Sequence, residues 1–287
     1  MRHQQKGVNS ERVTSNGPLP ATPVYRLLFT LPAVLFFSVS SLAGQIQDNS
    51  FLVEEAYNQE RGVVQHISTF ERSSGGDWEF AFTQEWPLGG IRHQLSYTIP
   101  VQRGSATGTG LGDVALNYRY QLVGNPEAIT VVAPRLSVLL PTGNDEVERG
   151  SGGVGLQANM PVSYVVGPSL VTHWNAGVTV TPSARNPLDQ SATTTDYNVG
   201  ASAVWLVRPS FNLLVEALWL STRSVVSDGQ TAGEKTGYLS PGMRMAFDLA
   251  GDLQIVPGLA YTFGLGRDSD PDAVFLYLSF EHPFSRQ

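Results

Sequence analysis

The chain contains no cysteine among its 287 residues. Disulfides, thiolate metal sites and thiol nucleophiles are therefore excluded. Charged residues are also scarce, at 15% of the chain, compared with about 25% in a typical soluble domain. The formal net charge is -7, so the basic surface that nucleic-acid binding requires is absent, and we expect no nucleic-acid partner.

The first 43 residues have the organisation of a secretory signal peptide. Arg2, Lys6, Arg12 and Arg26 precede the apolar run LLFTLPAVLFFSV, and the small residues SSLAG follow it. A single membrane anchor is the alternative. The apolar run is shorter than the roughly 20 residues that a spanning helix needs, and Pro32 interrupts it. We therefore expect cleavage near the end of this run and export of an acidic chain.

Beyond residue 60 the sequence alternates between apolar and polar residues in long segments. In LGDVALNYRYQLV, residues 111–123, every second residue from Val114 is apolar or aromatic, and Asn117, Arg119 and Gln121 lie between them. About twelve such segments follow one another without a helical period. An even number of long alternating strands is typical of an outer-membrane barrel. We therefore predict an all-β fold, a transmembrane antiparallel β-barrel whose apolar face meets lipid.

The connections between these segments alternate in length. Those at one end are mostly long and polar, such as TGNDEVERGSG (142–152), PSARNPLDQSATTTD (182–196) and TRSVVSDGQTAGEKT (222–236). Those at the other end are short, such as PLGG, VVGPS and VRPS. Barrels of this class have longer extracellular loops and short periplasmic turns. This orientation also predicts an aromatic girdle at the periplasmic strand ends, formed by Trp86, Tyr120, Tyr164, Trp205, Phe211, Phe247 and Phe284.

The polar residues of the same segments then face the interior of the barrel. The predicted lumen-lining residues are Arg92, Asn117, Arg119, Arg135, Gln157, Asn159, His173, Glu216, Arg244, Asp248 and Glu281. A network that stabilises a narrow barrel and a lining that selects a solute are both compatible with this mixture. Eight strands fill with side chains and sixteen leave a water channel, so about twelve predict a narrow or partly blocked pore.

Three motifs resemble catalytic or binding sequences. GSGGVG (150–155) has glycine spacing typical of dinucleotide sites, but it leads into a strand and opens no helix. The acidic turn DSDPD (268–272) lacks the Gly and Glu of a calcium loop. His66 and Ser68 share one strand face, as a nucleophilic pair would, yet no orienting Asn is evident. We therefore expect no enzyme activity, no catalytic residues, no metal and no cofactor.

The segments AYNQERGVVQHIS, GTGLGDVALNYRYQL and PRLSVLLPTGND resemble an outer-membrane β-barrel family named for phenol meta-cleavage pathway clusters. The resemblance is clearest over residues 51–166. It implies a barrel and the passage of small, often hydrophobic molecules, and it carries no binding residues over to this chain.

These observations predict a signal peptide (1–43), a periplasmic N-terminal lead (44–60) that folds into the lumen as a partial plug, and a barrel (61–287). The expected function is passive passage of a small organic molecule across a Gram-negative outer membrane. The alternatives are a structural or surface barrel with a closed lumen, and a lipid hydrolase that uses His66 and Ser68. The expected partners are outer-membrane lipid and lipopolysaccharide, the barrel-assembly machinery and the solute.

Overall fold

The structure is a computed structural model that describes residues 50–266 and 271–284. The predicted signal peptide, the first part of the lead (44–49) and Asp268 and Asp270 of the acidic turn lie outside the described residues. Within the described ranges, no helix is long and apolar enough to cross a membrane.

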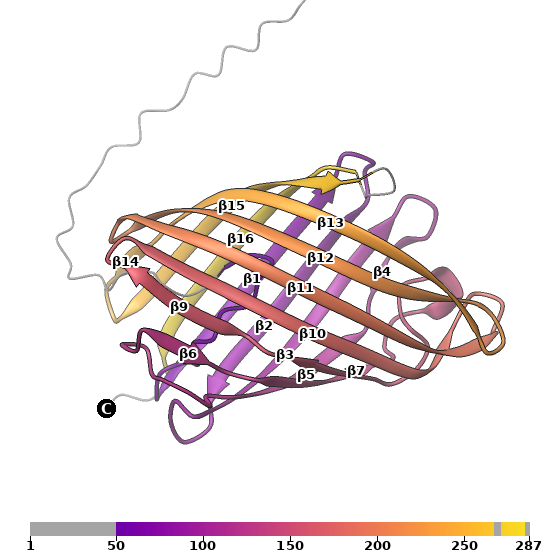
Figure 1. Ribbon diagram of the computed structural model, residues 1–287, viewed down its shortest axis with the longest axis horizontal. Helices are drawn as coiled ribbons and strands as arrows, with labels where there is room; N and C mark the ends of the chain where they lie inside the picture. Colours follow the sequence, from indigo (N-terminus) through magenta and orange to yellow (C-terminus); the bar gives the residue numbers. More distant parts are fainter. Residues whose placement is uncertain (1–49, 267–270, 285–287) are drawn as a thin grey trace, which may run out of the picture. The chain divides into compact units, whose positions relative to one another are not determined.

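Nearly all of the described chain is β-structure (Figure 1). A single short 3-10 helix, Asp145–Val147, is found among the described residues. The strands are β1 (Val63–Ser73), β2 (Trp78–Pro87), β3 (His93–Gly104), β4 (Gly108–Leu111), β5 (Val114–Tyr120), β6 (Thr130–Val132), β7 (Arg135–Leu140), β8 (Gly155–Asn159), β9 (Val162–Gly167), β10 (Leu170–Arg185), β11 (Ser191–Arg208), β12 (Phe211–Ser227), β13 (Gln230–Met245), β14 (Phe247–Leu249), β15 (Leu253–Leu265) and β16 (Ala273–Pro283).

These strands form one closed antiparallel barrel with twelve spans. Neighbours in the chain pair with one another, and β1 pairs with both β2 and β16 to close the sheet. Two spans are each divided into two short strands at a proline, Pro134 between β6 and β7 and Pro161 between β8 and β9, because proline cannot donate a ladder hydrogen bond. The predicted fold class is confirmed.

Large apolar side chains cover the outer face of this barrel. Along β12, Leu213, Val215 and Trp219 are exposed, whereas Asn212 and Glu216 are buried. The same alternation holds for the exposed Leu136, Leu156, Trp174, Met243, Leu259, Leu276 and Leu278 on other spans. An apolar outer belt with polar groups inside is the arrangement that hydrocarbon requires. The apolar face therefore points outward, as predicted, and the barrel spans a membrane.

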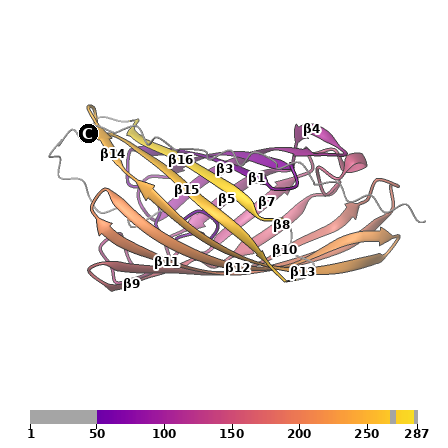
Figure 2. The ribbon, with the colours of Figure 1, turned by 90° about the horizontal axis from the view of Figure 1, so that it is seen from above.

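The long strands β10 to β13 differ in one respect from the sequence prediction (Figures 1 and 2). Most of the polar residues predicted as loops at 182–196 and 222–236 continue the strands, and only residues 186–190 and 228–229 connect them. In these extensions Ala184, Ala192 and Val225 form a small buried cluster, but the residues around them are mostly polar. The apolar alternation is therefore weak there, and the sequence pattern did not reveal the extensions. Gly229 makes the tighter turn with φ 70°, a conformation that favours glycine.

Candidate functional site

Of the polar residues predicted to line the lumen, all but one lie on strands of the barrel. Ten have buried or half-buried side chains on strands of the barrel: Asn117, Arg119, Arg135, Gln157, Asn159, His173, Glu216, Arg244, Asp248 and Glu281. Arg92 instead lies in the turn before β3 and is exposed, so it does not line the interior. Residues 91 and 92 belong to the turn after β2, and β3 begins only at His93.

The predicted girdle residues lie at or next to the ends of spans. Tyr120 ends β5, Phe211 begins β12 and Phe247 begins β14. Phe284 follows β16 directly and is 58% exposed. Trp86, Tyr164 and Trp205 lie within the last few residues of their strands. Trp86 contacts Tyr97 edge to face, with ring centroids 5.9 Å apart.

Residues 50–60, here called the crossing segment, run through the interior of the barrel. Their first hydrogen bonds are to β11 and β12, and their last are to β3, to β1 and to Gln121 just after β5. In the sheet order β12 and β3 are six positions apart in a barrel of twelve spans, so they lie on opposite walls. The segment forms no helix or strand. Its buried backbone groups therefore need side-chain partners from the wall.

Glu216 supplies the acceptors at one end of the crossing segment. Its carboxylate, fully buried on β12, accepts hydrogen bonds from the backbone N–H groups of three consecutive residues, Phe51, Leu52 and Val53. These bonds are 3.0–3.2 Å long. Charge-assisted hydrogen bonds are stronger than neutral ones, so one wall carboxylate fixes the direction of three residues.

Arg119 supplies the donors near the other end. Its guanidinium donates to the backbone oxygens of Glu55 (3.2 Å) and Tyr57, and to the side-chain oxygen of Asn58 (2.8 Å). It also lies 3.5 Å from carboxylate oxygens of Glu54 and Glu55. The side chain of Arg119 is 4% exposed. A buried charge requires such compensation, and most of this compensation comes from the crossing segment.

Neutral side chains complete the attachment between these two charged residues. The amide oxygens of Gln121 and Gln94 accept from the backbone N–H groups of Asn58 (3.1 Å) and Gln59 (2.7 Å). The hydroxyl of Ser163 accepts from the Ala56 N–H at 2.9 Å. Gln121 also donates to the Ala56 carbonyl at 3.0 Å. The Ser163 hydroxyl in turn lies 2.8 Å from Nδ1 of the buried His173. His173, one of the predicted lumen-lining residues, thus contacts Ser163, which in turn holds the crossing segment.

Glycines in the wall make room for the apolar side chains of the crossing segment. A Cβ atom at Gly258 would lie 2.5 Å from Phe51, and one at Gly242 would lie 2.9 Å from it. A Cβ atom at Gly200 would lie 2.9 Å from Val53. Each distance is shorter than a van der Waals contact, so no larger residue fits while the segment is in place.

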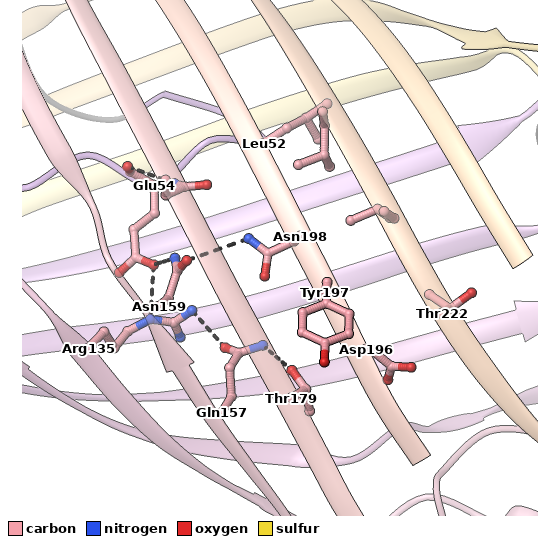
Figure 3. A pocket seen from close by; sticks show the side chains of 13 residues that line it. Leu52, Glu54, Arg135, Gln157, Asn159, Thr179, Asp196, Tyr197, Asn198 and Thr222 are labelled. Carbon is pink, nitrogen blue, oxygen red and sulfur yellow. Dashed lines mark hydrogen bonds and ion pairs between the residues drawn. The ribbon is translucent and has the colours of Figure 1, made fainter. Parts of the chain in front are cut away.

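Three of the cavities among the described residues lie in and above this interior. One of about 440 Å³ adjoins the extracellular loops and is lined by Glu79, Gln102 and Arg149, among others. A second, of about 220 Å³, shares Thr98 with the first. A third, of about 310 Å³, shares Leu52, Glu54 and Arg135 with the second (Figure 3). The crossing segment contributes residues to the two inner cavities.

Part of the interior wall is apolar, which the sequence reasoning missed. Leu214, Val204, Val171 and Leu206 form a buried cluster on β10, β11 and β12. Leu218 and Leu220 line the third cavity from β12. Both faces of β12 are rich in leucine and valine, which hides the alternation. Within residues 211–222 of β12, Glu216 is the charged residue, and its position identifies the even-numbered residues there as the inner face.

His66 lies on the outer face of the barrel. Its ring stacks on Phe280 with centroids 4.7 Å apart, and its Nε2 lies 3.3 Å from Nε2 of His282. Gln65, the preceding residue, is buried and donates to Glu281 at 2.5 Å. Ser68 shares the parity of His66 and therefore also faces outward.

Comparison with known proteins gives a family and a fold. The family described as "Putative MetA-pathway of phenol degradation" matches residues 43–280. An outer membrane channel from Pseudomonas putida F1 is 13% identical, with a TM-score of 0.58 over 79% of this chain and 97% of that one. The NanC porin is 9% identical, with a TM-score of 0.48 over 78% and 100% of the two chains. Among curated protein sequences no match is found.

Proposed function

The chain belongs to the family described as "Putative MetA-pathway of phenol degradation", and we propose that it is a passive outer-membrane channel for a small organic molecule of hydrophobic or aromatic character. Its fold is that of an outer-membrane barrel. The observation that carries the proposal is the succession of three cavities that share lining residues, from the extracellular loops to the crossing segment. A barrel with a purely structural role has no need of such spaces.

In this proposal the crossing segment is the closure of the channel. Its attachments to Gln94 and Gln121 lie on β3 and just after β5, at the periplasmic ends of these strands. Solute entering between the loops passes the outer cavity first and meets the segment in the two inner cavities, which the segment lines. Release to the periplasm requires the segment to move. The many hydrogen bonds of the segment favour a closed resting state. If the segment never moved, the lumen would stay closed, and the protein would be the structural barrel that is the alternative function.

No catalytic role is assigned to His66 and Ser68. The ring of His66 packs among Phe82, Phe280 and His282 on the lipid-facing side, where water for hydrolysis is scarce. The Ser68→Ala variant of the purified protein should therefore have the same lipase background as the unaltered barrel. A lipase activity that disappears in this variant would contradict the assignment.

Other expected partners follow from the same placement. The exposed apolar belt requires membrane lipid, and the outward-facing rim loops would meet lipopolysaccharide. Phe284, immediately after the last strand, is the aromatic residue that we assign to recognition by the barrel-assembly machinery.

The experiment that tests the function is planar-bilayer recording of the refolded mature protein. We expect small or absent conductance steps for the intact barrel and larger, stable steps once residues 44–58 are removed. Small aromatic solutes added on the side of the long loops should block these larger steps. A correctly folded, heat-modifiable barrel without conductance, before and after removal of residues 44–58, would contradict a channel function.

A further inference from the structure

The third cavity has the size of a site for one substituted aromatic ring. It lies between the crossing segment and the wall formed by β7, β8, β10, β11 and β12, and its volume is about 310 Å³ (Figure 3). An engineered apolar cavity of roughly 150 Å³ holds benzene. The space here therefore accommodates one ring, a polar substituent and a few waters.

One wall of the cavity is a chain of hydrogen bonds that ends at Thr179 (Figure 3). Arg135 contacts the Glu54 carboxylate at 2.9 Å and donates to Gln157 at 2.8 Å. Gln157 donates to the Thr179 hydroxyl at 2.9 Å. Asn159 donates to Glu54 at 2.7 Å. The charge of Arg135 is thus matched by Glu54, and the guanidinium is not available as an anion site.

Asp196 is a polar lining residue that takes no part in this chain of hydrogen bonds. It lies opposite Thr179 in the register of β10 and β11, and it lines the same cavity. Its Oδ1 accepts the N–H of Arg223 at 2.7 Å. Its Oδ2 accepts no hydrogen bond from the residues that the structure describes. A half-buried carboxylate oxygen facing a cavity is an acceptor for a donor group on a ligand.

The opposite wall is apolar. Leu218 and Leu220 of β12 and Leu52 of the crossing segment line the cavity there. An apolar surface facing a few polar groups is the usual composition of a small-molecule site. The charged residues of the lining are Glu54, Arg135 and Asp196. Both Arg135 and the neighbouring Arg119 contact Glu54, so the carboxylate of Asp196 is the negative group that a ligand meets in this cavity. A ligand that carries its own negative charge is repelled.

Building on the proposed channel, we propose that this cavity binds a single-ring molecule that carries a hydrogen-bond donor and no negative charge. The ring packs against Leu52, Leu218 and Leu220, and the donor, such as a hydroxyl, bonds to Oδ2 of Asp196. The site thus selects an alcohol or phenol over the corresponding aromatic acid.

The test is calorimetric binding to the detergent-solubilised barrel, with three probes that share one ring: benzyl alcohol, toluene and benzoate. Benzyl alcohol should bind best. Benzoate should bind at least tenfold more weakly, because its carboxylate is repelled by Asp196; a tenfold difference corresponds to about 1.4 kcal/mol. Asp196→Asn should reduce the preference for the alcohol over benzoate at least tenfold, because an amide N–H replaces the free oxygen and the charge is gone. The retained Oδ1 still accepts from Arg223.

Leu218→Asn should weaken binding of benzyl alcohol and toluene alike. Glu79→Gln is the matched control, because it makes the same carboxylate-to-amide type of change in the outer cavity and should alter neither affinity nor preference. Heat-modifiable migration checks that every variant is folded. Benzoate binding as tightly as benzyl alcohol, no binding of any probe, or affinities unchanged in both cavity variants would each overturn the site. If the barrel conducts but binds none of the ring probes, the binding site is refuted and the channel proposal stands. If it binds a ring probe but does not conduct, the channel proposal is refuted and the binding site stands.

Discussion

Removing the carboxylate of Glu216 should detach the first residues of the crossing segment from the wall. In the Glu216→Ala variant the N–H groups of Phe51, Leu52 and Val53 lose their acceptor. Each hydrogen bond to a charged group contributes about 1.5–3 kcal/mol net. Three of them together contribute on the order of 4–9 kcal/mol, from which the cost of burying the carboxylate must be subtracted.

Even a net loss of about 3 kcal/mol would raise the detached population roughly a hundredfold. Amide hydrogen exchange of the folded barrel measures this population directly. Exchange of the N–H groups of residues 51–53 should accelerate by about that factor, while Asn58 and Gln59, held by Gln121 and Gln94, should change much less.

Glu216→Gln keeps one acceptor oxygen and should give an intermediate rate. Glu79→Gln is the control, because Glu79 accepts from Gln102 on β3 and not from the crossing segment. Unchanged exchange at residues 51–53 in a folded Glu216→Ala barrel would refute the reasoning, because it would mean that the buried carboxylate does not hold the segment.

Three further outcomes are expected. Gly258→Val should displace Phe51 and increase single-channel conductance, whereas Gly167→Val, where an added Cβ meets nothing within 4 Å, should not; equal conductance would contradict the packing. Val215→Arg, on the lipid face of β12, should lower the free energy of unfolding in lipid vesicles by about 2–4 kcal/mol, and a change near zero would argue against a lipid-facing position. Arg119→Ala removes the cation between three carboxylates 3.5–3.9 Å away. The reversal potential in a salt gradient should therefore shift toward cation selectivity. An unchanged reversal potential would show that these charges do not face the permeant ions.

The sequence predicted the spans well where one face is polar. On β5, Asn117 and Arg119 alternate with Leu116 and Tyr118, and the structure places the first pair inside. Such alternation is visible because lipid and lumen differ strongly in polarity. On β12 the prediction of an inner lining was incomplete, because Leu218 faces inward in a strand that is apolar on both sides.

The detailed attachment of residues 50–60 was beyond the reach of sequence reasoning for a different reason. The segment has no period that reports its surroundings, and its partners Glu216 and Arg119 are more than 60 residues away in the chain. Its mixed apolar and acidic character suggested a place in the lumen. The glycine at position 258 could not be linked to Phe51 before the register of β15 was known.

The central claim is that residues 50–60 close a solute channel, and planar-bilayer recording of the mature barrel with and without residues 44–58 tests it most directly. We predict small or absent conductance steps for the intact barrel and larger, stable steps after the deletion. Equal conductance from two folded proteins would contradict the claim, because the segment would then not be the barrier to flow.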